Sequence, residues 1–293
     1  MKGADKMANK KLKAPVNIPV EKIHPFEGHP YKVLDNEEMN TLIESIQQKG
    51  VISPIVVRPL ENTEDEYEII SGHRRLRASV KAGLETVPAL IYAVSRDEAA
   101  IMLVDSNLHR EHILPSERAF AYKLKSEALK HQGKRTDLTS EQVAPKLATE
   151  QIGVTENVSK DTVKRYIRLT NLIPELLNLV DEERIAFTPA VELSYLNEVE
   201  QADLVEEIRV CDATPNLSQA QRLRAISKEE GLTPEHIGDI LAEEKANQRE
   251  KIKIPAERIR KYFPKSYTTE QIEEAIIKIC ESRYRARRDR DAR

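Results

Sequence analysis

The feature that most constrains this chain is one short stretch, Ser71-Gly72-His73-Arg74-Arg75-Leu76-Arg77-Ala78. It follows an apolar run typical of a strand, residues 67–70, and opens a run typical of a helix, with Gly72 at the bend. The start of a helix presents unpaired backbone N–H groups and the positive end of the helix dipole. A glycine at that point lets a bulky anion approach the backbone. The stretch therefore predicts a strand–turn–helix unit that suits an anion.

The helix that begins there carries a cationic stripe. Arg74, Arg77 and Lys81 recur at i, i+3 and i+7, which places them on one face. Leu76 and Val80 point elsewhere and are predicted to anchor the helix to a core. Guanidinium groups bind phosphate in a bidentate manner, so the stripe suits a di- or triphosphate. The alternative is an ordinary solvated helix face, and the pattern alone leaves both open.

A second stretch, Asp105 to Glu111, offers complementary chemistry. Asp105 supplies a carboxylate, Asn107 an amide and Arg110 another guanidinium. Oxygen ligands of this kind hold a metal-bound phosphate or a sugar. The two stretches together predict a phosphate site in the first part of the chain.

Three segments resemble a known family. Gly72–Ala78 is similar to the Gly-Glu-Arg-Arg-x-Arg-Ala signature of ParB-type partition proteins, and Asn107-x-x-Arg110 resembles the end of their Glu-Asn-x-x-Arg sequence. Upstream, Leu42-x-x-Ser45-Ile46-x-x-x-Gly50 followed by Pro54-Ile55-x-Val57-Arg58 is similar to their first conserved segment. Three matches in the family's order are a more specific signal than a lone glycine-rich loop.

The resemblance implies a segregation protein that binds CTP with Mg²⁺ and clamps DNA. Asn107 would meet the Mg²⁺-bound phosphate. The nucleotide-binding residues that the resemblance implies are Ser45, Gly50, Gly72, His73, Arg74, Arg75, Arg77, Asn107 and Arg110. It also implies a homodimer, a palindromic centromere-like site on double-stranded DNA, a ParA-type Walker ATPase as companion, and association with a nucleoid or plasmid.

The chain departs from the family pattern at positions tied to nucleotide turnover. His73 and Ser106 each stand where the family has glutamate, and His24–Lys32 replaces Asn-Pro-x-Gln-Pro-Arg. Nucleotide binding is therefore predicted, and weak CTP hydrolysis is left open. His29, His73 and His109 are interpreted as polar loop or helix-cap residues rather than a metal site.

Composition limits the remaining classes. Of 293 residues, 32% are charged, 4% are aromatic and none is Trp, which suits a helix-rich chain with modest cores. Lys and Arg number 46 against 49 Asp and Glu, so DNA binding must be argued from local clusters. Two distant cysteines, Cys211 and Cys280, exclude a disulfide scaffold and fit a reducing cytosol. No apolar run approaches a membrane span, so a soluble cytoplasmic protein is expected.

Short strands alternate with short helices over Val16–His112, which predicts a compact α/β module with the cationic helix start at the end of a strand. Asp35 and Glu38 form a capping pair for a helix ending at Gly50. The predicted strands are 17–20, at an edge because of Pro19, then 55–57, 68–70 and 87–92.

A helical region follows. A helix is predicted over Pro115–Gln132, ended by Gly133, and another from Thr139, shortened or kinked by Pro145. The connection over 149–158 is longer than a usual helix–helix turn.

The next helix, 159–169, has the features of a DNA-reading helix. Ser159 caps it, Val163, Tyr166 and Ile167 pack inward, and the opposite side is basic. The candidate DNA-binding residues are Ser159, Lys160, Thr162, Lys164, Arg165 and Arg168, in which the two lysines and Arg168 form one row. An ordinary amphipathic surface helix is the alternative. The Tyr-Ile-Arg-Leu-Thr run with its following Leu-Ile-Pro is similar to the segment after the ParB helix-turn-helix.

Further helices are predicted downstream, at 175–181, 189–196, 200–209, 218–227 (capped by Ser218) and 232–248 (capped by Thr233). Tyr195 is assigned to the bundle core with its leucine and valine neighbours. Arg222 and Arg224 are interpreted as solvated arginines or as contacts to the DNA backbone.

The C-terminal segment has a linker or edge strand at 251–255, an aromatic group at 262–264 and a long helix over 269–288. The helix carries an apolar stripe for which a dimer face and packing onto its own domain are equally open. The stripe comprises Ile272, Ala275, Ile276, Ile279 and Tyr284. The arginine-rich end suits non-specific phosphate contact or is a solvated tail.

The predicted fold is an α+β ParB/sulfiredoxin-like module followed by an all-α helix-turn-helix domain and a helical C-terminal segment. The predicted boundaries are a basic tail at 1–14, a nucleotide-binding domain at 15–113, a DNA-binding domain at 114–230 and a C-terminal segment at 231–293.

Two other function classes compete. The first is an enzyme of sulfiredoxin or nuclease type on the same N-terminal fold. A sulfiredoxin needs a cysteine, which Ser71-Gly72-His73-Arg74 lacks. A nuclease needs clustered carboxylates, and only Asp105 and Glu111 are present around the site. A transcriptional or copy-control regulator with the same DNA-binding half is not separable from a partition protein by sequence.

Overall fold

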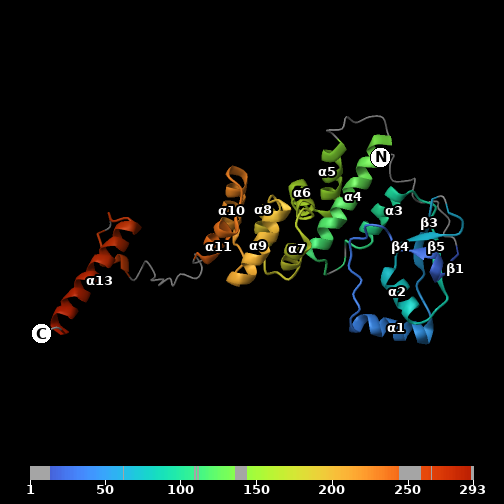
Figure 1. Cartoon of the computed structure of the whole chain (residues 1–293), viewed down its shortest axis with the longest axis horizontal. Helices are drawn as coiled ribbons and strands as arrows, with labels where there is room; N and C mark the ends of the chain where they lie inside the picture. Colours follow the sequence, from blue (N-terminus) through green and yellow to red (C-terminus); the bar gives the residue numbers. More distant parts are fainter. Residues whose placement is uncertain are drawn as a thin grey trace. The chain divides into compact units, whose positions relative to one another are not determined.

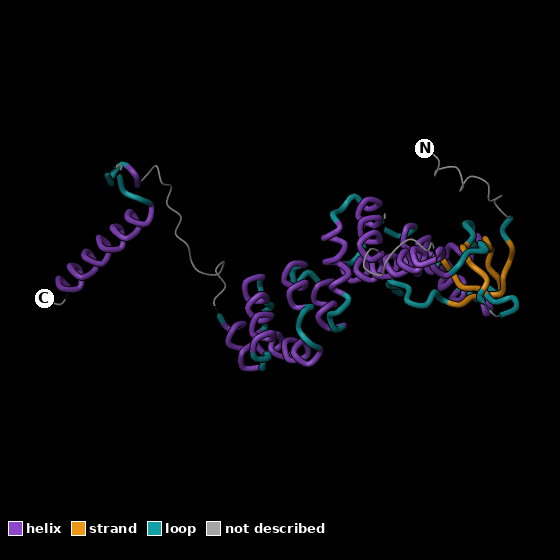
Figure 2. Tube along the Cα trace, turned by 90° about the horizontal axis from the view of Figure 1, so that it is seen from above, coloured by secondary structure: helices purple, strands orange, loops and turns teal. Residues whose placement is uncertain are grey.

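The structure is a computed structural model in which residues 14–61, 63–108, 110, 112–135, 144–243, 259–264 and 266–291 are described. The described residues up to Glu243 form one compact unit and those from 259 onward form a second (Figure 1). Strands occur only in the first part of the described chain, and helices make up the rest (Figure 2). The predicted sequence of an α+β module followed by all-helical segments is confirmed. Among the described residues, no helix is long and apolar enough to cross a membrane.

The first unit begins with a mixed five-stranded sheet in the order β1-β5-β3-β4-β2. The strands are β1 (Val16–Pro19), β2 (Ile23–His24), β3 (Ile55–Pro59), β4 (Tyr67–Ser71) and β5 (Thr86–Ile91). β3 pairs antiparallel with β4 and parallel with β5, with an irregularity between Val56 and Val57. β1 lies at the edge, as predicted, because Pro19 has no N–H to donate to a further strand.

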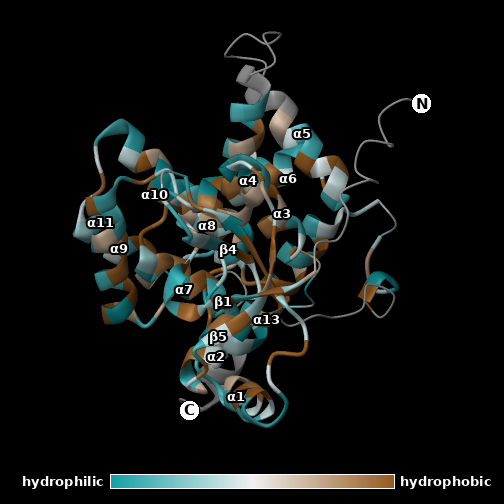
Figure 3. Ribbon diagram, turned by 90° about the vertical axis from the view of Figure 1, so that its right-hand side faces the viewer, coloured by the Kyte–Doolittle hydropathy of each residue, from teal (hydrophilic) through white to brown (hydrophobic). Residues whose placement is uncertain are grey.

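Helices cover both faces of the sheet, because its central strands are apolar on both sides. In β4, Ile69 faces a cluster that includes Leu76 of α2 (His73–Lys81), while Ile70 faces Leu103 of α3 (Arg96–Asp105). Much of the strand ribbon is coloured as hydrophobic residues (Figure 3). The helix α1 (Glu37–Lys49) packs on the outer side of α2.

The ends of α1 and α2 differ in part from the prediction. Asn36, not Asp35, caps α1 by accepting a hydrogen bond from the Met39 N–H, because Asp35 is turned toward α2. Val80 does not anchor α2: it is 56% exposed, and the two residues before it, Ala78 and Ser79, are buried instead.

The helix α3 was not predicted, although the sequence carries its start signal. Ser95 and Glu98 form a capping box in which each side chain bonds the other's backbone N–H. α3 packs along α4 (Pro115–Arg135). The prediction that Gly133 ends α4 is wrong, because the helix continues to Arg135; a glycine inside a helix costs only about 1 kcal/mol.

The connection between α5 (Ala144–Glu156) and α6 (Lys160–Leu169) has three residues and is shorter than predicted. Pro145 lies in the first turn of α5, where a missing N–H costs nothing, so it does not kink the described helix. The predicted helix start at Thr139 lies outside the described residues. A Cβ on Gly153 would lie 2.8 Å from the Val158 carbonyl oxygen. This glycine therefore lets the turn pack directly against α5.

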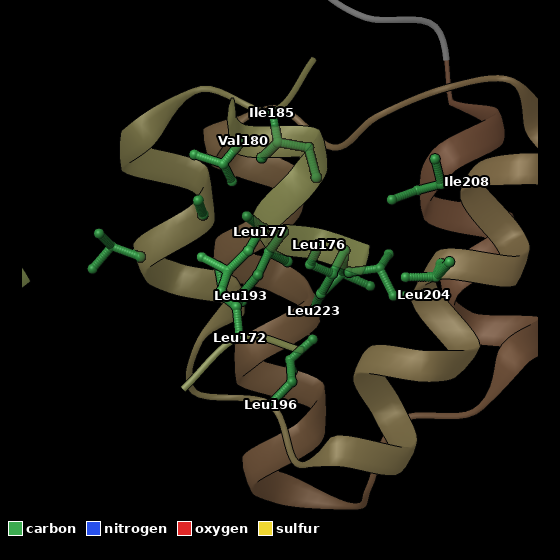
Figure 4. Close-up of a cluster of buried hydrophobic side chains, with 14 of the residues drawn as sticks. Leu172, Leu176, Leu177, Val180, Ile185, Leu193, Leu196, Leu204, Ile208 and Leu223 are labelled. Carbon is green, nitrogen blue, oxygen red and sulfur yellow. The ribbon is translucent and has the colours of Figure 1, made fainter. Parts of the chain in front are cut away.

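The remaining helices of the first unit enclose a second core. They are α7 (Pro174–Asp181), α8 (Phe187–Leu193), α9 (Glu198–Cys211), α10 (Leu217–Glu229) and α11 (Pro234–Ala242). Their leucine, isoleucine and valine side chains meet between the helices (Figure 4). Thr233 caps α11 as predicted, whereas Asn216 rather than Ser218 caps α10. Tyr195, predicted in the core, is 45% exposed.

The second unit contains α13 (Thr269–Asp291), which is longer than the predicted helix. Its apolar stripe is only partly covered: Ile272 and Ile276 are half-buried, while Ile279 and Tyr284 are exposed. Phe263 packs near Tyr267. The predicted basic tail lies almost wholly outside the described residues, and the predicted segment 251–255 lies wholly outside them.

Candidate nucleotide and DNA-binding sites

The start of α2 follows β4 directly, as predicted, but its glycine has a different role. Gly72 has a φ of 101°, which only glycine adopts without strain. A Cβ there would lie 2.9 Å from Ile55 Cγ2 and 3.0 Å from Arg75 Nη2. The space left by the missing side chain is thus filled by the chain itself. Gly72 allows this turn to pack on β3, and an anion would have to approach from another side.

The cationic stripe of α2 is neutralised by carboxylates at the start of α1. Asp35 accepts two hydrogen bonds from Arg77, at 2.9 and 2.6 Å, and lies 2.8 Å from Lys81 Nζ. Arg74 Nη2 lies 3.0 Å from Glu38 Oε2. The hydrogen bonds from Arg77 and Lys81 lower the pKa of Asp35 to about 2. The stripe therefore faces α1, and a phosphate would compete with Asp35 and Glu38 for it.

The other predicted residues near α2 have structural contacts. Arg75 Nη1 donates to the carbonyl oxygens of Ser53 and Pro54, at 2.5 and 2.7 Å, and thereby ties α2 to the segment before β3. Burial lowers the pKa of this guanidinium. Ser45 is half-buried on α1, and Gly50 ends that helix with a φ of 69°.

His73, at the first position of α2, belongs to a different group of side chains. Its ring centroid lies 3.8 Å from that of His29, which also contacts the ring of Tyr31 at 5.6 Å. The guanidinium of Arg110 lies 5.7 Å from the Tyr31 ring centre. We call His29, Tyr31, His73 and Arg110 the histidine cluster.

Burial dominates the electrostatics of the histidine cluster. It lowers the pKa of His73 to about 3, with His29 and Arg110 adding to the effect, and it also lowers the pKa of His29. Burial raises the pKa of Tyr31. Both imidazoles are therefore neutral at pH 7, and His73 Nε2 has no hydrogen-bond partner among the described residues. The cluster therefore offers neutral ring nitrogens and one cation, the guanidinium of Arg110. One of its members, His73, stands where the family signature has a glutamate.

Asn107 follows the end of α3 and is only 5% exposed. Its Nδ2 donates to the Leu103 carbonyl oxygen at 2.7 Å and lies 3.2 Å from Ser106 Oγ. The amide nitrogen is thus used within its own helix end, so a predicted metal contact of Asn107 would have to use the amide oxygen. One protein oxygen fits a Mg²⁺ ion held mainly by phosphates and water. The described residues contain no group of three His, Cys, Asp or Glu side chains placed to hold a metal alone.

Lys125 of α4 joins three helices close to this point. Its side chain is 4% exposed, and its Nζ lies 2.5 Å from Asp105 Oδ1 of α3 and 3.8 Å from Glu156 Oε1 of α5. Asp105 is therefore engaged by Lys125.

A cavity of about 460 Å³ lies between the 28–32 segment, the start of α4 and α7. His29 and Phe120 are among its lining residues. Beside it, Asp181 accepts hydrogen bonds from the N–H and hydroxyl of Ser116, at 3.0 and 2.6 Å, and from Lys32 Nζ at 3.1 Å. Lys32 and Asp181 are far apart in sequence, so no short-range pattern could have identified this contact.

The structure divides the predicted nucleotide-binding residues into two groups. Arg74, Arg77 and the α1 residues lie on the α1 side of α2, whereas His73 and Arg110 lie beside the 29–31 segment. His109 and Glu111 lie outside the described residues.

The N-terminal half of α6 agrees with the prediction. Ser159 caps the helix by accepting a hydrogen bond from the Thr162 N–H at 3.0 Å. Lys160 and Lys164 are exposed and form only surface ion pairs, with Glu150 and Asp161. Such pairs contribute little energy, so both lysines are available to a duplex.

The C-terminal half of α6 differs from the predicted single basic row. Arg168 is half-buried and donates to the Ser194 carbonyl oxygen at 3.0 Å. Arg165 donates to Thr188 Oγ1 at 2.9 Å, and its guanidinium lies 4.9 Å from the Phe187 ring centre. Both arginines therefore turn toward α8 and the residue that follows it. The groups they contact there are the Phe187 ring, the Thr188 hydroxyl and the Ser194 carbonyl.

Comparison with known proteins shows what the chain is similar to. Residues 2–108 match the model of the ParB N-terminal domain family. The nucleoid occlusion protein of Listeria innocua is 32% identical over 194 residues, which cover 66% of this chain and 62% of that protein. The chromosome-partitioning protein Spo0J of Thermus thermophilus is 34% identical over 170 residues, which cover 58% and 56%. The chain thus spans less than two thirds of the length of both relatives.

Among solved structures, the C-terminally truncated ParB of Caulobacter crescentus complexed with CTP-gamma-S is 25% identical. That comparison covers 67% of this chain and 99% of the other, with a TM-score of 0.32. The match over residues 2–108, together with the similarity to a curated chromosome-partitioning protein, leads to one conclusion: the first part of the chain is a ParB N-terminal domain.

Proposed function

We propose that this protein is a site-specific DNA-binding protein of the ParB type whose grip on a duplex is controlled by CTP. The observation that carries the proposal is the connection between the two candidate sites. The helix α4 packs against α3, at the end of the ParB N-terminal domain, and also against α5 and α6. A change at the nucleotide site therefore has a direct route to the DNA-reading helix.

CTP as the nucleotide rests on the similarity of Gly72–Ala78 and Asn107-x-x-Arg110 to the family's segments. Arg74 and Arg77 are the phosphate ligands in this proposal, and they exchange Asp35 and Glu38 for the nucleotide. Bidentate guanidinium–phosphate contacts are strong enough for such an exchange, because surface ion pairs contribute about 1 kcal/mol or less. Asn107 supplies one oxygen to Mg²⁺, which when bound neutralises phosphate charge.

The α5–α6 pair is the proposed DNA-binding unit. In a helix–turn–helix, the second helix enters the major groove with its N-terminal residues against the base edges. Here the exposed Lys160 and Lys164 and the half-buried Thr162 take that place, while α4 and α5 pack against the helix. A palindromic site and a homodimer follow from the two-fold symmetry of such readers.

The proposed process is DNA segregation, with a ParA-type ATPase as companion. The support is the similarity to curated proteins named for chromosome partition. Whether a plasmid, a mobile element or a chromosome is segregated is a separate question from DNA binding, and the neighbouring genes bear on it directly.

The decisive experiment measures nucleotide selectivity. A palindromic duplex is selected from a random pool with the purified full-length chain, and CTP, ATP and GTP binding is then measured by calorimetry with and without that duplex. We expect CTP to bind in the presence of Mg²⁺, and ATP and GTP not to bind. CTP should bind more tightly when the duplex is present. A chain that selects a duplex but ignores all three nucleotides is a plain repressor.

A nucleoid occlusion role is the second candidate, favoured by the 32% identity to a curated protein of that name. A transcriptional or copy-control regulator belongs with it, because neither requires an ATPase companion. Stimulation of a neighbouring Walker ATPase by the purified chain supports partition, and no stimulation supports the second candidate.

A further inference from the structure

One aromatic ring, at the end of α8, holds two guanidinium groups from different helices. The Cζ atom of Arg168 in α6 lies 4.0 Å from the ring centre of Tyr195, and that of Arg224 in α10 lies 3.5 Å from it. We call these three residues the Tyr195 stack. Both distances are within the range of a favourable cation–π contact, so the ring fixes both cations in place.

The charges around the Tyr195 stack do not balance. Arg224 forms an ion pair with Glu192 at 2.7 Å, but Arg168 has a neutral carbonyl as its acceptor. Arg165, one turn before Arg168, contacts a hydroxyl and a ring. Neither Arg165 nor Arg168 forms an ion pair with any described residue, so one carboxylate serves three guanidinium groups here. Like charges held close together repel, and an added anion would relieve that repulsion.

The position of the stack indicates which anion it suits. It adjoins the C-terminal half of α6, whose N-terminal half carries the exposed lysines. When the first turn of a recognition helix contacts base edges, the parts of the protein beside it contact the sugar–phosphate backbone. Tyr195 is part-exposed, as are the side chains of Arg224 and Glu192. The anion that fits this place and chemistry is a DNA phosphate.

We propose that the Tyr195 stack binds the phosphate backbone of the duplex and thereby extends the DNA-binding surface from α6 to α10. This inference rests on the proposed function. Arg224 is the residue added to the interface. The sequence pattern of α10 does not distinguish it from Arg222, and only its contact with Tyr195 does. Its contribution is independent of DNA sequence, since phosphates carry no base identity.

The test compares Arg224→Ala with Arg222→Ala in the full-length chain. Arg222 lies on the same helix but pairs with Glu243 at 2.6 Å, outside the stack, and is the matched control. Affinity is measured between 50 and 200 mM salt for the selected palindromic duplex and for an unrelated duplex of equal length. We expect Arg224→Ala to weaken both complexes about equally and to reduce the slope of log affinity against log salt by about 0.9, the value of one phosphate contact. Arg222→Ala should leave the slope unchanged.

A second variant separates phosphate binding from a structural role. Glu192→Gln removes the one carboxylate from the stack, so it should tighten both duplexes and steepen the salt dependence. A stack that only joins helices predicts no gain from this change. Unfolding midpoints of all three variants identify any general loss of fold.

The results that overturn the inference differ from those that overturn the proposed function. Equal salt slopes for wild type, Arg224→Ala and Glu192→Gln, with wild type still binding DNA, remove the Tyr195 stack from the interface. A wild-type chain that binds no duplex removes the proposed function and this inference with it.

Discussion

The arginines of α2 and those of α6 resemble each other in sequence and differ in what surrounds them. On α2, Arg74 and Arg77 face carboxylates of α1 at ion-pair distance. On α6, Arg165 and Arg168 face aromatic rings and neutral oxygens. The first pair is neutralised by the protein itself, whereas the second is fixed in position with its charge uncompensated by any described residue.

Because of this difference, the two regions would bind an anion in different ways. A phosphate at α2 must displace a carboxylate, so binding there is an exchange of partners and can act as a switch. A phosphate at α6 and α10 meets cations that are already positioned, so binding needs little reorganisation. A controlled nucleotide site and a preformed DNA surface are the functions that suit these two arrangements.

The largest effect is expected at Lys125, which carboxylates neutralise as they do the arginines of α2. Its ammonium group has almost no access to water. Lys125→Met should lower the free energy of unfolding by about 3–5 kcal/mol, because Glu156 would remain buried without its partner. Denaturant unfolding measures it, with Lys123→Met on the same helix as the control. Adding Glu156→Leu should restore part of the loss, and no restoration would contradict the electrostatic cause.

The exchange at α2 is tested by changing each partner of one ion pair. Arg77→Ala should reduce CTP affinity about tenfold or more, because a charge-assisted contact is lost. Asp35→Asn should instead raise CTP affinity, because it removes the competing carboxylate. Calorimetry measures both, with Arg96→Ala, an exposed paired arginine of the same module, as control. Unchanged affinity in Arg77→Ala would reject the site.

The preformed surface is tested at Arg165. Arg165→Ala should weaken the selected and the unrelated duplex about equally and reduce the salt slope by about 1, because a guanidinium turned toward α8 is placed for a phosphate rather than for a base edge. Mobility shifts at several salt concentrations measure both, with Arg209→Ala, an exposed arginine of α9, as control. Duplexes bound as tightly as by wild type would remove Arg165 from the preformed surface.

The smallest effect concerns pH. His73 is neutral in the folded chain because its pKa is lowered from 6.5 to about 3, so the unfolded chain binds more protons between these values. Stability is therefore fully present above pH 6.5 and falls as the pH is lowered. Between pH 7.5 and 5.5 the loss from this residue is about 1 kcal/mol. His73→Gln should reduce that dependence, measured by denaturant unfolding at both pH values; an identical dependence in the variant would contradict the assignment.

Local patterns in the sequence were sufficient for much of the fold. Alternation and apolar periodicity placed the predicted strands and nearly all the helices, and the caps Ser159 and Thr233 were identified correctly. The helix α3 was missed because its apolar residues do not form one clear stripe, although its capping box was readable. Gly72 and the reversal of direction at the end of β4 were also readable, because only glycine adopts that backbone conformation readily.

The partners of charged side chains could not be predicted, and they decide the candidate sites. Asp35 is 42 residues from Arg77, and Lys32 is 149 residues from Asp181. Periodicity predicts which face of a helix is polar but not which group lies opposite it. For this reason the sequence predicted the cationic stripe on α2 without its carboxylate partners, and the basic row predicted on α6 needed correction.

Sequence patterns were enough for most of the strands and helices, the glycine turn into α2, the capped helix α6 and the resemblance to the ParB-type family. These depend on backbone conformation and on contacts a few residues apart, which neighbouring residue types encode directly. Two features are visible only in the folded structure: carboxylates neutralise the α2 arginines, and the Tyr195 ring contacts arginines from two helices. Such contacts join distant segments, and their geometry exists only once the helices have packed.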